Sequence, residues 1–171
     1  MRFDFKSLAL KYAAVVVMPL ALLLYTPAVN FSILVFGTRV LLETVPVDPT
    51  DFLRGDYVTL DYEILRISSE MLPESSETVY VTLSLNQEGV ASMKKVSVTR
   101  PLENELYLKG VVSRRWGSRF VDCGLGAYYV PEGTGWDLER AIQNHRVMAD
   151  VRVLRGRAVI SSLIVGPELT D

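Results

Sequence analysis

The 171-residue chain has one cysteine and one histidine, and each scarcity excludes a class of site. A single thiol, Cys123, cannot form a disulfide within the chain. One cysteine and one histidine are also too few for a zinc site built from these residues. A lone cysteine suits an oxidising compartment, where an unpaired second thiol would be a liability. We therefore expect no metal and no cofactor.

An excess of basic charge is missing as well. The chain has 18 basic and 20 acidic residues, which gives a net charge of −2. A nucleic-acid-binding domain usually carries a basic patch or stripe, so this balance gives no support to such a partner. The Gly-rich run Gly124–Gly135 lacks the Gly-x-Gly-x-x-Gly spacing and the Lys-Ser/Thr pair of phosphate-binding loops. We expect neither a nucleic acid nor a nucleotide as a partner.

Charge is absent altogether between Tyr12 and Thr38. A helix needs about 20 predominantly apolar residues to cross the hydrocarbon core of a bilayer. The uncharged run is long enough, and its densest part is Ala13–Tyr25. The sequence therefore predicts one membrane span near residues 10–30, with the lipid bilayer as a partner.

Basic residues flank this run unevenly and predict its orientation. Arg2, Lys6 and Lys11 precede the run, and the next basic residue is Arg39. The positive-inside rule then places the N-terminus in the cytoplasm and the rest of the chain outside. We expect residues 1–37 to form an anchor and juxtamembrane segment of a single-pass cell-membrane protein, and residues 38–171 to form an extracytoplasmic domain.

Two other interpretations of the apolar run stay open. A cleaved signal peptide has the same basic start and apolar core. Thr26-Pro27-Ala28 is a poor cleavage site, because proline is disfavoured beside the cut, so a retained anchor is favoured. A buried helix of a soluble protein usually has one apolar stripe, whereas Ala13–Tyr25 is apolar nearly all round.

Beyond the apolar run, apolar and polar residues alternate with the period of two that is typical of half-buried strands. The predicted strands are Arg39–Val45, Val58–Ile64, Val79–Leu85, Val90–Thr99, Leu106–Arg115, Arg119–Cys123, Val147–Val153 and Ala158–Val165. One helix is predicted after Gly135, because Leu138, Ala141, Ile142 and His145 have the spacing of a buried helical face. Seven or eight short strands with one helix predict a mainly β domain, an antiparallel barrel or sandwich.

The most distinctive local string is Gly55-Asp56-Tyr57-x-x-Leu60-x-Tyr62, which follows Pro46-Val47-Asp48-Pro49 and Leu53-Arg54. A second block is Tyr129-Val130-Pro131-Glu132-Gly133, with Gly135 and Glu139 after it. These strings, together with the N-terminal apolar segment, resemble the bacterial GDYXXLXY family. The resemblance implies a membrane-anchored protein that works with a polytopic membrane protein. The family has no characterised function, so the resemblance implies no catalytic residue.

The two blocks hold the candidate binding site. The pattern favours a polar cluster at one end of the β domain, where the loop Asp48–Tyr57 meets the loop Tyr129–Gly133. Arg54 offers a fork of donors, and Asp56 and Glu132 offer acceptors. The candidate binding residues are Asp48, Arg54, Asp56, Tyr57, Tyr62, Tyr129 and Glu132. The alternative is a rigid structural loop, with its backbone fixed by proline and by Asx turns.

No complete catalytic constellation is present in the sequence. Ser92 with Lys94 or Lys95 offers the residue types of a Ser/Lys protease, but all three lie within one short strand. We favour a non-enzymatic accessory or interaction subunit of a polytopic membrane protein. The alternative is an extracytoplasmic hydrolase that uses carboxylates of the Asp56/Glu132 region.

Overall fold

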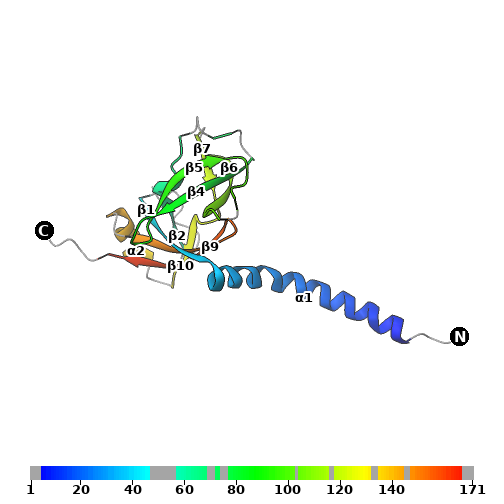
Figure 1. Ribbon diagram of the computed structural model, residues 1–171. Helices are drawn as coiled ribbons and strands as arrows, with labels where there is room; N and C mark the ends of the chain where they lie inside the picture. The colour runs from blue at the N-terminus through cyan, green and yellow to red at the C-terminus, as the bar shows by residue number, and fades with distance from the viewer. Residues whose placement is uncertain are drawn as a thin grey trace.

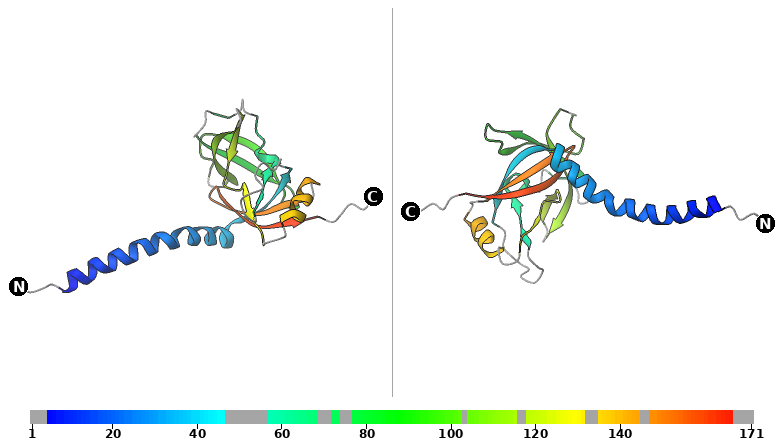
Figure 2. Two further views of the ribbon diagram at one scale, coloured as in Figure 1. Left: turned by 180° about the vertical axis from the view of Figure 1, so that it is seen from behind. Right: turned by 90° about the horizontal axis from the view of Figure 1, so that it is seen from below.

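A long N-terminal helix projects from a β-rich body in the computed structural model (Figure 1). The structure describes residues 5–46, 57–68, 72–73, 77–102, 104–115, 118–131, 135–144 and 147–166. Two further views show that the helix leaves the β body at one corner and points away from it (Figure 2). The two parts of the chain therefore meet only where the helix ends.

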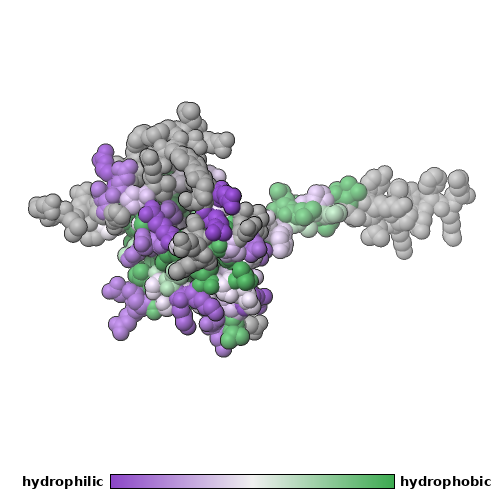
Figure 3. All heavy atoms as spheres, turned by 90° about the horizontal axis from the view of Figure 1, so that it is seen from above, coloured by the Kyte–Doolittle hydropathy of each residue, from purple (hydrophilic) through white to green (hydrophobic). Residues whose placement is uncertain are grey.

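The helix α1 (Phe5–Phe36) covers the uncharged run and contains Pro19 and Pro27. Its segment Val15–Phe36 is 22 residues long and, by length and composition, is long and apolar enough to cross a membrane. On the face shown in Figure 3, apolar side chains predominate over the described part of the helix. Within Val15–Phe36 the buried side chain is that of Ile33, which is 3% exposed where the helix meets β9 and β10. Val29 and Ser32 are partly buried, and the other side chains of this segment are exposed.

Ten strands form three antiparallel sheets among the described residues. One four-stranded sheet has the order β10 (Arg157–Val165), β9 (Val147–Leu154), β1 (Thr38–Val45) and β3 (Asp61–Tyr62). The other has the order β5 (Ala91–Ser97), β4 (Thr78–Leu85), β6 (Tyr107–Arg115) and β7 (Ser118–Asp122). A two-stranded ribbon pairs β2 (Tyr57–Thr59) with β8 (Ala127–Tyr129). A 3-10 turn, η1 (Glu63–Leu65), and the helix α2 (Gly135–Gln143) complete the described elements.

Alternation along the strands builds one core between the sheets. Val40 and Leu42 of β1 pack in the same buried cluster as Val79 and Val81 of β4. Full burial of such a side chain stabilises a fold by about 1.5–3 kcal/mol. The two four-stranded sheets also meet through the backbone, because the N–H of Lys109 donates to the carbonyl of Gly156 at 2.7 Å.

The mainly β class, with antiparallel sheets and an N-terminal apolar helix, is confirmed. Two details differ from the sequence-based expectation of seven or eight strands. The predicted strand Val58–Ile64 is divided into β2, β3 and η1, because β2 pairs with β8, β3 pairs with β1, and a 3-10 turn follows. The strand β8 forms inside the Gly-rich run, where no alternation indicated it. The helix α2 is present near its predicted place, and His145 lies outside the described residues.

Candidate functional site

The two blocks of the sequence that carry the family resemblance meet in the ribbon of β2 and β8. Tyr57 lies opposite Tyr129, and Thr59 lies opposite Ala127. Because the pair is antiparallel, β2 begins at the end of the ribbon where β8 stops. The loop that precedes Tyr57 and the loop that follows Tyr129 are therefore attached at the same end of the ribbon.

Four of the predicted binding residues lie outside the described part of the chain: Asp48, Arg54, Asp56 and Glu132. The predicted cluster of Arg54 with these carboxylates therefore stays a prediction. Of Tyr57 the structure describes the backbone, which pairs with Tyr129. The ring of Tyr129 is 81% exposed, so it is accessible at the surface beside this end of the ribbon.

The second half of the motif is buried and joins the two blocks. Leu60 is buried, and its N–H donates a hydrogen bond to the carbonyl of Gly126 at 3.0 Å. The hydroxyl of Tyr62 donates to the carbonyl of Leu125, also at 3.0 Å. Since Leu125 is buried, the bond from Tyr62 satisfies a backbone acceptor inside the core. The Leu-x-Tyr part of the motif thus fixes the segment that leads into β8.

Tyr62 therefore has a structural position, although it is among the predicted binding residues. Its side chain is 1% exposed, and its hydroxyl is engaged with Leu125. Burial raises the pKa of Tyr62 well above its usual value, and the nearby Asp61 and Cys123 raise it further. The hydroxyl consequently keeps its proton and acts as a donor within the core. It presents no free group to a ligand.

Cys123 lies beside this region and is not an activated nucleophile. Burial raises the pKa of its thiol to about 12, with a further contribution from Asp122. A thiol reacts as its thiolate, so a protonated thiol is inert at neutral pH. A Cβ atom built on Gly110 would lie 2.9 Å from Sγ of Cys123, which shows how tightly the sulfur packs against β6. Cys123 thus behaves as a small, half-buried packing residue.

The residue types of a Ser/Lys protease do not form a pair. Oγ of Ser92 lies 3.0 Å from Oγ of Ser84 on the neighbouring strand. Nζ of Lys94 instead lies 4.0 Å from Oε1 of Glu105. Over the described ranges, no group of three or more His, Cys, Asp or Glu side chains is placed to hold a metal ion.

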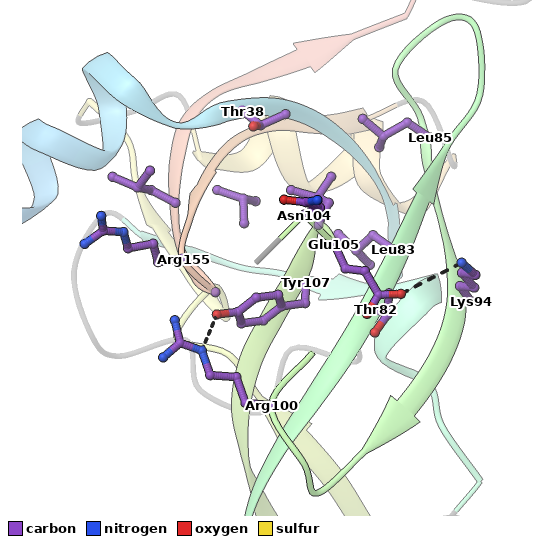
Figure 4. A pocket seen from close by; sticks show the side chains of 14 residues that line it. Thr38, Thr82, Leu83, Leu85, Lys94, Arg100, Asn104, Glu105, Tyr107 and Arg155 are labelled. Carbon is purple, nitrogen blue, oxygen red and sulfur yellow. Dashed lines mark hydrogen bonds and ion pairs between the residues drawn. The ribbon is translucent and has the colours of Figure 1, made fainter. Parts of the chain in front are cut away.

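Sequence reasoning missed a cavity of about 710 Å³ between the two four-stranded sheets, close to the junction of α1 and β1 (Figure 4). Its buried walls include Leu83, Tyr107 and Val153. Charged side chains on its rim are those of Lys94, Arg100, Glu105 and Arg155. These residues come from separate strands and turns, so no local string in the sequence indicates the cavity.

Comparison with known proteins finds a matching family model but no individual protein that matches. No curated protein and no solved structure shows a significant match to the chain. A family model described as GDYXXLXY protein matches residues 19–163, which include the end of the apolar helix and nearly all of the β body. The resemblance carried by the Gly-Asp-Tyr string is thereby confirmed, and the chain belongs to the GDYXXLXY protein family.

Proposed function

We propose that the protein is a single-pass, membrane-anchored accessory subunit whose β domain lies on the extracytoplasmic side and whose partner is a polytopic membrane protein. The observation that carries this proposal is the bare apolar helix Val15–Phe36. Leu23 and Phe36 are 72% and 75% exposed, and their neighbours along the helix are similarly uncovered. Transfer of such a side chain from water to an apolar phase is favourable by about 1.5–3 kcal/mol.

The length of the helix suits a bilayer. At a rise of 1.5 Å per residue, 22 residues extend for about 33 Å. The hydrocarbon core of a typical bilayer is about 30 Å thick. The two prolines inside the helix are tolerated in spanning helices better than in soluble ones. Basic residues before the helix, Arg2, Lys6 and Lys11, favour a cytoplasmic N-terminus.

The β domain is attached to the helix without a linker. Only Gly37 separates Phe36 of α1 from Thr38 of β1. The N–H of Gly37 donates to the carbonyl of Ile33 at 2.8 Å, and an added Cβ at Gly37 would lie 3.1 Å from Cβ of Arg152. The last turn of the helix is therefore packed on β9. A domain held in this way keeps a fixed place at the membrane surface, which suits a subunit that contacts a neighbouring membrane protein.

The helix also has a face on which another helix can pack. Ala14, Ala21 and Ala28 recur every seven residues, and Ser32 lies one turn beyond Ala28. Residues seven apart lie close to the same face of a helix. Small side chains allow the backbones of two helices to approach in a bilayer, where they are enriched at helix contacts. This face supports a transmembrane helix of the partner as the contact.

Co-purification from gently solubilised membranes tests the partnership. The chain is captured by an affinity tag, and the membrane proteins recovered with it are identified and quantified. Ala21→Leu adds bulk to the small-residue face, whereas the control Val16→Leu adds bulk on the opposite side of the helix. Ala21→Leu is expected to lower recovery of the partner severalfold, because the bulky side chain keeps the two helix backbones from approaching closely.

The control variant Val16→Leu shows which result would contradict the helix partnership. Val16→Leu is expected to recover as much of the same polytopic protein as the unchanged chain does. If no polytopic protein is recovered with the unchanged chain, or if both variants recover equal amounts, the proposed helix partnership is wrong.

A further inference from the structure

We propose that the cavity between the two four-stranded sheets binds an anionic lipid, with the anionic headgroup between Arg100 and Arg155 and an apolar part against the buried walls. That this lipid comes from the membrane rests on the proposed anchoring of the chain by α1. The cavity volume of about 710 Å³ lies within the range of about 300–1,000 Å³ that is usual for small-molecule sites.

The walls of the cavity are apolar at depth. Leu83 of β4 and Val153 of β9 line it from the two facing sheets, and Tyr107 of β6 extends across it. All three residues are buried, with exposed fractions of 3–5%. These groups offer contact to hydrocarbon but no charge. The chemistry at depth therefore suits the glycerol backbone and first methylene groups of a lipid.

The charged groups are divided between two sides of the rim (Figure 4). On one side Lys94 lies 4.0 Å from Glu105, so these charges offset each other. On the other side lie the guanidinium groups of Arg100 and Arg155. Nε of Arg100 donates to the hydroxyl of Tyr107 at 3.1 Å. Within the described chain, the terminal nitrogens of Arg100 and the whole guanidinium of Arg155 have no hydrogen-bond or ion-pair partner.

This positive side belongs to a domain whose overall balance of charge is acidic. After Gly37 the chain has 15 basic and 19 acidic residues, so the domain as a whole repels anionic surfaces. Arg100 and Arg155 on one side of the rim thus give an anion a local positive surface within this acidic domain. Their planar forks match the oxygens of a phosphate, to which they can donate two parallel hydrogen bonds.

The same aromatic residue positions both arginines. The hydroxyl of Tyr107 accepts the bond from Arg100, and its ring packs against Gly156, the neighbour of Arg155. The turn that carries Arg155 is fixed further, since the N–H of Lys109 donates to the carbonyl of Gly156. Tyr107 in turn meets Tyr80 edge to face, with ring centroids 5.7 Å apart. The backbone of the turn that carries Arg155 and the position of Arg100 are therefore fixed by contacts within the fold.

The place of the cavity identifies the source of the ligand. Thr38 lines the cavity and is two residues from Phe36, the last residue of α1. Two residues of extended chain span about 7 Å. If α1 crosses a bilayer, the cavity lies within reach of the lipid headgroups. A phosphate-bearing lipid offers the anion and the apolar part together.

Calorimetric titration of the full chain in a neutral detergent tests this site. The probe is dihexanoyl phosphatidylglycerol, and the comparison probes are dihexanoyl phosphatidylcholine and inorganic phosphate. We expect saturable binding of the glycerol lipid and at least tenfold weaker binding of the other two. Arg100→Gln and Arg155→Gln are each expected to weaken binding of the glycerol lipid about tenfold, because each removes a charge-assisted hydrogen bond.

Arg157→Gln is the matched control. Arg157 is exposed on the same hairpin as Arg155 but does not line the cavity, so its loss should leave the affinity unchanged. Equal weakening by Arg157→Gln would show diffuse charge and overturn the proposal. Equal binding of phosphatidylcholine or of free phosphate would overturn the anionic lipid as the ligand. Absence of saturable binding would overturn the site. The titration requires neither an oriented membrane nor a partner, so its failure is distinct from failure of the proposed function.

Discussion

Gly156 of the β9–β10 turn lies directly against the ring of Tyr107 on β6. A Cβ atom added at Gly156 would lie 2.9 Å from Cδ2 of Tyr107 and closer still to Cε2. The contact joins two sheets whose strands are distant in the sequence, and the bond from Lys109 to Gly156 reinforces it. Gly156 also has a φ of +83°, which side chains other than glycine rarely adopt. Backbone conformation and packing thus both require glycine here.

Gly156→Ala is therefore expected to destabilise the β domain more than its φ alone would. Gly89→Ala is the matched control, because Gly89 has the same φ of +83° and an added Cβ there would meet nothing within 4 Å. A left-handed conformation costs an L-residue about 1–2 kcal/mol. We expect that cost at both positions and about 1–3 kcal/mol more at Gly156, from overpacking. Urea unfolding of the two variants measures the difference. Equal losses of unfolding free energy would show that the contact with Tyr107 adds no cost at Gly156.

Tyr62→Phe tests the role of the motif in joining the two blocks. The change removes the hydroxyl that donates to Leu125 and leaves a buried carbonyl without its donor. An unsatisfied buried group of this kind costs about 1–3 kcal/mol. Tyr80→Phe removes a hydroxyl for which the described structure gives no hydrogen bond, so it should change the stability by less than about 0.5 kcal/mol. A stability unchanged by Tyr62→Phe would mean that the bond to Leu125 contributes little.

Cys123 is expected to make the stability of the folded chain depend on pH under alkaline conditions. Its pKa is raised from an ordinary value of 9.0 to about 12, so the folded state holds the thiol proton more tightly than the unfolded state. The contribution to stability is complete below pH 9 and is lost as the pH rises from 9 towards 12. Urea midpoints between pH 7 and pH 10.5 should fall more for the unchanged chain than for Cys123→Ala. Parallel curves would show that the thiol titrates normally.

Much of the fold could be predicted from the sequence because its strands are half-buried. Alternation identified strands such as Thr78–Leu85 and Val147–Leu154, whose two faces meet different environments. The strand Ala127–Tyr129 was not predictable, because three residues carry too little pattern to be told from a Gly-rich loop.

The candidate site was harder to predict than the fold. The motif residue Tyr62 looks functional in the sequence because the string that holds it is distinctive, yet its described contacts lie inside the core. The cavity has the opposite character. Arg100 and Arg155 are ordinary surface residues in the sequence and come together only because Tyr107 packs between the segments that carry them. A local sequence pattern cannot indicate a cavity whose residues are brought together only by tertiary packing.

Cysteine labelling in intact cells measures the central claim, a membrane-anchored chain with its β domain outside. In a Cys123→Ala background, Glu88→Cys places a thiol in the exposed turn between β4 and β5, and Lys6→Cys places one before the apolar run. A membrane-impermeant maleimide should label Glu88→Cys in intact cells and Lys6→Cys only after permeabilisation, with both proteins in the membrane fraction. Labelling of Lys6→Cys in intact cells with protection of Glu88→Cys, or recovery of either protein in the soluble fraction, would contradict the account.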